Sequence, residues 1–242
     1  MIAEHDAPPF EIDVEAAEAI LALADDELVI GHRHSEWLGL SPFLEEDLTM
    51  ASIAQDELGH ARALYALVWP SWTNRDAMVV CRAAFAWRSC AFVERTCDVW
   101  EDALVRHLLY DIGEGVRWPS LVMRFEAAVA GLADLAERAS AEERYHRRHA
   151  IDLVTRLGTG TRHANMRLQH ALDALWADSL AAVESDLEAL YVGECTPVFE
   201  AAALMTPSIT AAQRDRTTRS DGFGSVHDSL LAVASIDPTA TW

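Results

Sequence analysis

The sequence predicts an all-α protein, and three features of its residue pattern favour that class. Apolar residues recur every three or four positions over most of the 242 residues, which is the period of an amphipathic helix. No segment alternates apolar and polar residues as a half-buried β-strand does. Gly (11 residues) and Pro (8 residues) are few, so few breaks between helices are expected. This length and periodicity fit a single domain, residues 1–242, built as a helical bundle with additional helices.

Two helices are predicted in the N-terminal part of the chain. The first covers 13–33, where Ala, Leu and Ile repeat at helical intervals until Gly39 and Pro42 interrupt the pattern. The second covers 44–69 and stops at Pro70. Three acidic residues in its first turn suit the positive end of the helix dipole, which supports this start.

Two more helical regions are predicted in the middle of the chain. One covers about 76–116, with a break inside it, and is interrupted at Trp118-Pro119 because proline disrupts a helix interior. The other covers 121–157 or 132–157, and Gly158 is interpreted as its C-terminal cap. These four helical regions are expected to form the core bundle.

The chain continues beyond this core bundle, which spans about 13–157. A fifth helix is predicted over 163–191, and the tail 192–242 is expected to combine a short helix with a polar segment at 213–222. We interpret that polar segment as a mobile loop or as a segment that faces a partner. The fifth helix is expected to cover one side of the bundle or to contact another subunit through one apolar stripe. The stripe consists of Leu168, Leu172, Leu175, Trp176, Leu180, Val183, Leu187 and Leu190.

The charge of the chain excludes several kinds of partner. The formal net charge is −20, from 39 acidic and 19 basic residues, and every basic residue is Arg because the sequence contains no Lys. So acidic a surface repels nucleic acid and anionic membranes, and neither is expected as a partner. No apolar run approaches the length of a membrane span.

The protein is expected to be cytoplasmic. Its opening segment contains neither the basic nor the apolar region of an export signal. Its four cysteines, Cys81, Cys90, Cys97 and Cys195, form no CxxC pair and show no zinc-like spacing. Reduced thiols are therefore expected.

The sequence contains two copies of the short motif Glu-x-x-His, and these contain the candidate metal-binding residues. Glu57 and His60 lie in the second predicted helix, and Glu143 and His146 lie in the fourth. Helix positions three residues apart point about 60° apart, so each Glu and His can reach the same point. Carboxylate and imidazole together suit iron or manganese. A single Glu-x-x-His commonly marks a solvated helix face, but two matching copies favour a metal site.

Each motif follows an upstream carboxylate at a nearly equal distance along the chain. Glu27 precedes Glu57 in this way, and Asp111 precedes Glu143. Two antiparallel helices place residues at the same height when both are equally distant from the connecting turn. Asp111 is preferred because it follows an apolar Leu-Leu-Tyr run, and Glu114, one helical turn closer to Glu143, is the alternative.

These residues together predict a ferritin-like four-helix bundle built around a dinuclear metal site. Two helices that each supply Glu-x-x-His and two that each supply a carboxylate form the di-iron ligand set of such bundles. Two iron ions per chain are expected, with manganese as the alternative. Asp56 and Glu142 are interpreted as groups that orient the histidines of the opposite helix, or else as surface acids. The predicted metal ligands and catalytic residues are Glu27, Glu57, His60, Asp111, Glu143 and His146.

Three runs of the sequence resemble a known family. They are LADDELVIGHRHSEWLGLSPFLEEDLTMASIAQDELGHAR (23–62), EERYHRRHAIDLVTRLGTGT (142–161) and GFGSVHDSLLAV (222–233), and the chain ends in Trp242. In this order they resemble the phenylacetyl-CoA monooxygenase (ring 1,2-epoxidase) family, and most closely its smaller, C-type subunit. The resemblance covers most of the chain.

The sequence combines features of both subunit types of that family. In that family the di-iron site lies in the catalytic A-type subunit, whereas the C-type subunit has the same fold, has typically lost metal ligands and serves as a structural partner. This sequence is C-like, but its ligand positions are filled as in the A-type subunit, which also has an Asp where Asp111 stands. The filled positions are Glu27, Glu57, His60, Glu143 and His146.

The resemblance implies a di-iron oxygenase component that uses O2 to oxidise an aromatic acyl-CoA or a related aromatic acid. Electrons would come from an external reductase, because the sequence has no Gly-rich fingerprint for a flavin or nicotinamide. A homodimer, a helical paralogous subunit, or both are the expected protein partners. Two alternatives stay open, a non-catalytic C-type subunit that stabilises a catalytic paralogue and a ferritin-like iron oxidase or storage protein.

Overall fold

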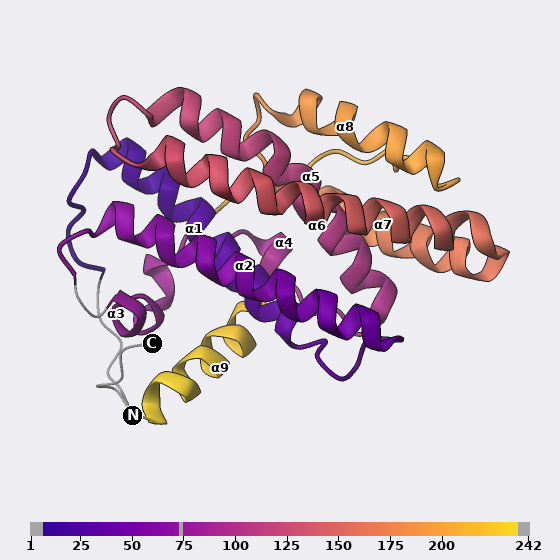
Figure 1. Cartoon of the computed structure of the whole chain (residues 1–242), viewed down its shortest axis with the longest axis horizontal. Helices are drawn as coiled ribbons and strands as arrows, with labels where there is room; N and C mark the ends of the chain where they lie inside the picture. The colour runs from indigo at the N-terminus through magenta and orange to yellow at the C-terminus, as the bar shows by residue number, and fades with distance from the viewer. Residues whose placement is uncertain (1–6, 73–74, 237–242) are drawn as a thin grey trace. The chain divides into compact units, whose positions relative to one another are not determined.

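A computed structural model describes residues 7–72 and 75–236, and every regular element in those ranges is a helix (Figure 1). The predicted all-α class is therefore confirmed. The chain groups into two compact units, whereas the sequence predicts one domain. The first unit comprises 1–96, 124–135 and 215–242, and the second comprises 97–123 and 136–214. Among the described helices, none is long and apolar enough to cross a membrane.

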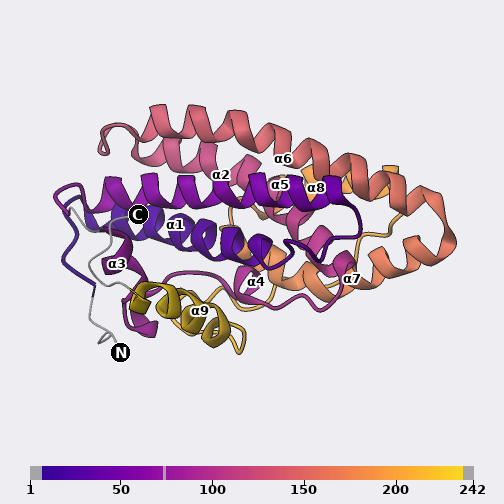
Figure 2. The same ribbon diagram turned by 60° about the horizontal axis from the view of Figure 1, so that its bottom comes forward.

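The first unit is centred on an antiparallel helix pair. Helix α1 (Val14–Ser35) and helix α2 (Leu44–Val68) lie side by side along their lengths (Figure 2). Asp13 caps α1, since its carboxylate accepts hydrogen bonds from the Glu15 and Ala16 backbone N–H groups at 3.0 and 3.2 Å. These bounds agree with the predicted helices at 13–33 and 44–69 to within two residues.

Short elements complete the first unit. They are α3 (Arg75–Val80), a 3₁₀ turn η1 (Ala84–Ala86), α4 (Ala91–Glu94) and α9 (Phe223–Ile236), which contacts α1, α3 and α4. The predicted break in the helical region 76–116 lies between Cys81 and Val99, where η1 and α4 are short helical turns. The segment stays irregular because its polar side chains are buried against backbone groups. Arg82, for example, donates to the carbonyls of Val79 and Ala86 at 3.0 and 3.3 Å.

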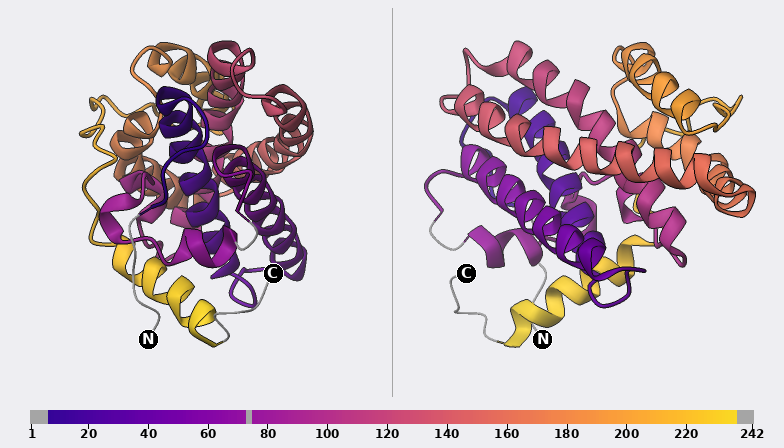
Figure 3. Two further views of the ribbon diagram at one scale, coloured as in Figure 1. Left: turned by 90° about the vertical axis from the view of Figure 1, so that its left-hand side faces the viewer. Right: turned by 45° about the vertical axis from the view of Figure 1, so that its right-hand side comes forward.

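The second unit contains another antiparallel pair, α5 (Trp100–Phe125) and α6 (Leu132–Gly160) (Figure 1, Figure 3). The predicted interruption at Trp118-Pro119 is wrong, because α5 continues through Pro119. The proline ring meets the carbonyl of the residue four positions earlier, which is Gly115. Gly115 has no side chain that would add to this crowding. Trp118, the residue before this proline, is buried.

Gly158 does not cap α6, so that prediction is wrong. The helix runs on to Gly160, and a methyl group on Gly158 would stand 2.2 Å from the Ala202 carbonyl oxygen. Gly158 therefore allows the backbone after α8 to approach α6 closely. The residue is required for packing within the second unit and not for a left-handed cap.

The predicted fifth helix at 163–191 is two helices, α7 (Arg162–Ala182) and α8 (Glu188–Ala201). Trp176 of α7 stacks on Tyr191 of α8 at 5.9 Å and meets Phe199 edge-on at 5.4 Å. The first six residues of the predicted stripe are buried by these contacts and their neighbours, whereas Leu190 is exposed. These six residues are thus covered within the chain and are not available to a partner.

Residues 215–222 of the polar segment 213–222 are attached within the first unit. Arg216 and Arg219 bind to α1 and to the segment 88–94 of the first unit. The expected mobile loop is therefore not what the structure shows, whereas the alternative of a segment that faces a partner stays a prediction. The physical reason is that these guanidinium groups pair with buried carboxylates that lie far away in the sequence.

Candidate metal site

The first unit brings three predicted ligands together on α1 and α2. One donor atom each from Glu27, Glu57 and His60 lie within 4.8 Å of one another. All three residues are buried. His60 Nδ1 stands 3.5 Å from Glu27 Oε2 and 3.6 Å from Glu57 Oε2. The upstream carboxylate and the Glu-x-x-His motif therefore converge as the helical spacing predicts.

These separations fit ligands of one cation. Two donors at ~2.1 Å from a metal ion and ~90–110° apart are separated by roughly 3.0–3.4 Å, whereas hydrogen-bonded N and O atoms lie at about 2.7–3.2 Å. The His60 distances of 3.5 and 3.6 Å are close to the ligand–ligand range. The donors, two carboxylates and one imidazole, are also the chemical types that suit iron or manganese.

The second unit brings a matching set together on α5 and α6. Asp111, Glu114 and Glu143 each offer a carboxylate oxygen, and these atoms lie within 4.8 Å of one another. His146 Nδ1 stands 3.4 Å from Glu143 Oε1. All four residues are buried. Three carboxylates at such spacing repel one another, and a bound cation offsets that repulsion.

Asp111 and Glu114 both reach this cluster, so both alternatives for the third helix stay compatible with it. Asp111 also has a histidine neighbour that sequence reasoning missed. His107 Nδ1 lies 3.2 Å from Asp111 Oδ2, one helical turn earlier on α5, and both side chains are fully buried. The i, i+4 spacing of His107 and Asp111 is visible in the sequence and could have revealed the pair.

A cavity of about 230 Å³ opens onto the carboxylates of the second unit. Arg147 forms one part of its wall and donates to Glu194 Oε2 of α8 at 2.5 Å, instead of neutralising an acid of its own helix. Gly115 leaves space for this side chain, since a methyl group there would stand 3.1 Å from the Arg147 guanidinium. The lining residues are Asp111, Glu114, Gly115, Trp118, Pro119, Ser140, Glu143, Arg144 and Arg147.

The first unit has an apolar cavity of about 210 Å³ beside the helix pair. Its wall includes Leu28 and Leu58, each the chain neighbour of a predicted ligand. Tyr65 also lines it, but the Tyr65 hydroxyl donates to Asp25 Oδ1 at 2.5 Å. Burial, followed by the Asp25 charge, raises the pKa of the Tyr65 hydroxyl well above 10.0. The other lining residues are Ala61, Arg62, Val79 and Val80.

Asp56 and Glu142 differ in exposure although they hold equivalent places before a ligand Glu. Asp56 is half-buried, and Glu142 is exposed. Their role in orienting the histidines of the opposite helix stays a prediction.

The donor sets fit a metal, and they correspond to the predicted residues. One set holds Glu27, Glu57 and His60, and the other holds Asp111, Glu114 and Glu143, with His146 beside Glu143. In both motifs the imidazole presents Nδ1 to the carboxylates. Nδ1 would thus bind the metal, and Nε2 would carry the proton.

Comparison with known proteins agrees with the sequence runs described above. A family model described as "phenylacetic acid catabolic protein" matches residues 1–242. Over 168 residues, the chain is 30% identical to the C-type subunit of the 1,2-phenylacetyl-CoA epoxidase of Escherichia coli (strain K12). That alignment covers 69% of this chain and 66% of the relative, slightly less than two thirds of its length. The resemblance is therefore confirmed at the level of the family.

Proposed function

Because the chain belongs to the phenylacetic acid catabolic protein family, we propose that it is the di-iron oxygenase component of an enzyme that oxidises an aromatic acyl-CoA or a related aromatic acid. The observation that supports this proposal is the burial of two Glu-x-x-His motifs, each beside a carboxylate of the adjacent helix. A purely structural subunit needs no such donors. Buried ionisable groups cost several kcal/mol each unless they are paired or bind a cation.

The proposal assigns six ligands to one dinuclear centre. This assignment rests on the sequence pattern, in which a carboxylate followed at a nearly constant spacing by Glu-x-x-His occurs twice. Glu57 and Glu143 would each supply a carboxylate to the centre. When bound, iron would supply the redox chemistry that activates O2 for insertion into an organic substrate.

The remaining residues would bind substrate and exclude water. The cavity lined by Leu28, Leu58 and Val79 would suit an aromatic ring, because most of its wall is apolar, with Arg62 and Tyr65 as its polar residues. Arginine side chains would bind the phosphates of an acyl-CoA. An external reductase would deliver the electrons.

A second function has one observation in its favour. The relative from Escherichia coli is the C-type subunit of its enzyme, so on that likeness this chain would be a non-catalytic helical subunit that stabilises a catalytic paralogue. The two functions differ in what the protein does alone. An oxygenase component loaded with iron reacts with substrate, and a structural subunit does not.

A single-turnover experiment separates them. The isolated chain is reconstituted with Fe(II), reduced chemically, mixed with phenylacetyl-CoA under O2, and analysed for an oxygenated product by mass spectrometry. The proposed function predicts a product that carries one atom from ¹⁸O2 and is absent with the Glu57→Ala variant. Product only after addition of an A-type paralogue, equal for wild type and Glu57→Ala, would favour the structural subunit.

A further inference from the structure

Three consecutive acidic residues of α1 project in different directions from the helix turn that carries Glu27. Successive helix residues point about 100° apart, so Asp25, Asp26 and Glu27 face three directions. All three are fully buried. Glu27 faces His60 on α2, whereas Asp25 and Asp26 face the irregular segment 82–94 and the chain's C-terminal part. Contacts on more than one side of α1 therefore keep the helix from rotating about its axis.

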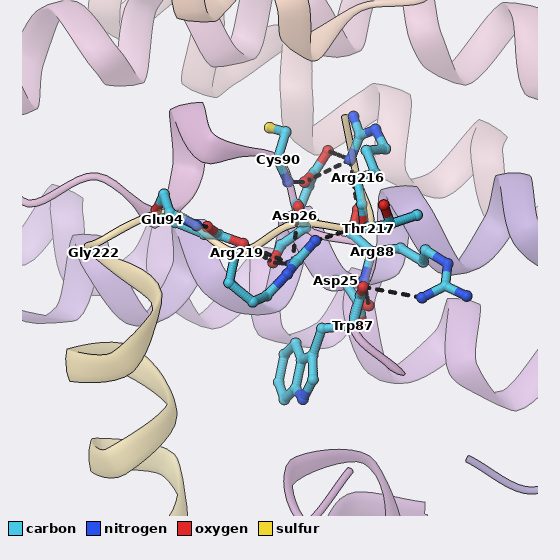
Figure 4. Close-up of polar contacts among 12 residues, drawn as sticks. Asp25, Asp26, Trp87, Arg88, Cys90, Glu94, Arg216, Thr217, Arg219 and Gly222 are labelled. Atoms are coloured by element: carbon cyan, nitrogen blue, oxygen red, sulfur yellow. Dashed lines mark hydrogen bonds and ion pairs between the residues drawn. The ribbon is translucent and has the colours of Figure 1, made fainter. Parts of the chain in front are cut away.

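Asp25 is bound by α2 and by the segment after α3. Its carboxylate accepts from Arg82 at 2.5 Å and from the Tyr65 hydroxyl at 2.5 Å. It also accepts from the Arg88 backbone N–H at 2.6 Å (Figure 4). Arg82 also lies over the Trp87 ring at 4.5 Å. These contacts fix one side of the α1 turn that carries Glu27.

Asp26 is bound by a residue far away in the sequence. The Arg216 guanidinium donates to Asp26 Oδ1 at 3.0 Å and lies 2.9 Å from Oδ2. The Cys90 backbone N–H donates to Asp26 Oδ1 at 2.8 Å, and Arg216 also donates to the Arg88 carbonyl at 2.8 Å (Figure 4). Arg216 therefore ties the turn before Glu27 to segment 88–90.

A second attachment lies nearly two turns further along α1. Seven residues are close to two full turns of a helix, so Arg33 shares a helix face with Asp26. Arg33 donates to the carbonyls of Glu94 and Gly222 at 2.6 and 3.0 Å. Arg219 donates to the Glu94 carboxylate at 2.7 Å, so segment 216–222 contacts this face at both points.

Gly222 makes the second attachment possible. A methyl group on Gly222 would stand 2.3 Å from the Glu94 carbonyl oxygen, which is backbone and cannot move as a flexible side chain does. Gly224, two residues later, has nothing within 4 Å of such a methyl group. These two glycines therefore form a matched pair for experiment.

From these contacts we infer that residues 215–225 clamp α1 and that Arg216 is a positioning residue for the metal ligand Glu27. The clamp fixes the rotation of α1 through Asp26 and Arg33, and the Glu27 carboxylate lies on the same rigid turn. Ligands must be held within about 0.5 Å and 10–20° of their productive geometry, which packing and supporting hydrogen bonds provide. This inference rests on the proposed function, because Glu27 is a ligand only if the site binds metal.

The test compares metal affinity among full-length variants. Co(II) or Fe(II) is titrated into apo protein in competition with a chelator, for wild type, Arg216→Ala, Gly222→Ala, Gly224→Ala and the exposed-arginine control Arg148→Ala. We expect Arg216→Ala and Gly222→Ala to lose roughly 10–100-fold in affinity, as removal of supporting partners does, with helix content by circular dichroism retained. Gly224→Ala and Arg148→Ala should match wild type. Arg216→Lys should recover part of the loss, since one ammonium group can still reach Asp26.

Hydrogen exchange gives a second readout. Amides of residues 24–31 should exchange faster in apo Arg216→Ala than in apo Arg148→Ala. Wild-type affinity in both Arg216→Ala and Gly222→Ala would overturn the inference while leaving the proposed function intact. A wild-type chain that binds no metal would instead overturn the proposed function, and the ligand role of Glu27 with it. If Gly222→Ala does not fold, the metal affinity of Arg216→Ala alone tests the inference.

Discussion

Gly31 of α1 lies directly against Glu57 of α2. A methyl group on Gly31 would stand 3.0 Å from the Glu57 Cβ, 3.1 Å from the Ala54 carbonyl oxygen and 3.2 Å from the Leu58 Cγ. The absence of a side chain thus lets the two helices approach each other one turn after Glu27. The spacing of the Glu27, Glu57 and His60 donors depends on this approach.

Replacing Gly31 with Ala is expected to separate α1 and α2. Overpacking of this kind costs about 1–3 kcal/mol, more than the gain of roughly 0.5–1 kcal/mol that Ala brings to a helix. The free energy of unfolding, measured in urea, should fall, and metal affinity should fall with it. Gly59→Ala is the control, since nothing lies within 4 Å of its added methyl group, and it should be slightly stabilised. Equal stability of Gly31→Ala and Gly59→Ala would contradict the close packing.

Replacing Glu57 or Glu143 with Ala is expected to abolish metal binding without unfolding the helices. Both carboxylates are buried beside other acids, so their removal relieves repulsion in the apo protein. The apo variants should melt at or above the wild-type temperature. Metal analysis and thermal circular dichroism measure the two effects. Two metal ions bound per Glu57→Ala chain would show that this residue is not a ligand.

The metal-ligand candidates could be predicted because short-range sequence spacing determines where their side chains point. Glu-x-x-His places two side chains on one helix face whatever surrounds the helix, and the equal spacing to each upstream carboxylate follows from a hairpin of two helices. Helices α1 and α2 were predictable for the same reason, since their apolar periodicity is continuous. The choice between Asp111 and Glu114 was not, because both lie on the buried side of α5.

The irregular parts could not be predicted because long-range contacts determine them. Nothing near Arg216 indicates that its partner is Asp26, and nothing near Gly222 indicates that the Glu94 backbone passes so close. One local signal was missed. Three successive acids in the middle of an apolar helix cannot all face solvent, so Asp25 and Asp26 could have been identified as buried groups with distant partners.

Thiol reactivity is expected to follow burial. Burial raises the pKa of the Cys195 thiol from 9.0 to about 12, so its thiolate fraction at pH 9 is about one in a thousand. The native state keeps this proton while the unfolded chain loses it above pH 9, so stability falls as pH rises from 9 towards 12.

Mass spectrometry after iodoacetamide treatment at pH 9 should show half-buried Cys97 modified well before Cys195. In urea both should react alike, and equal native rates would contradict the assignment.

Self-association remains a prediction of the family resemblance. Exposed large apolar side chains gather in the α1–α2 connection and the first turns of α2, at Leu38, Leu40, Phe43, Leu44 and Leu48. Exposed apolar residues grouped in this way favour a protein contact. Sedimentation of the pure chain at micromolar concentration should give a dimer or larger species, with Leu44→Glu and Leu48→Glu shifting it towards monomer. A 26.7 kDa monomer for the wild type would exclude the homodimer.

Iron content after reconstitution tests the central claim most directly. Apo protein is loaded with Fe(II) without O2, freed of excess iron, and examined by metal analysis and Mössbauer spectroscopy before and after exposure to O2. The proposal predicts two iron ions per chain, coupled to each other after oxidation as in a dinuclear carboxylate centre. Folded wild-type protein that retains no iron, or that retains as much as Glu57→Ala, would contradict it.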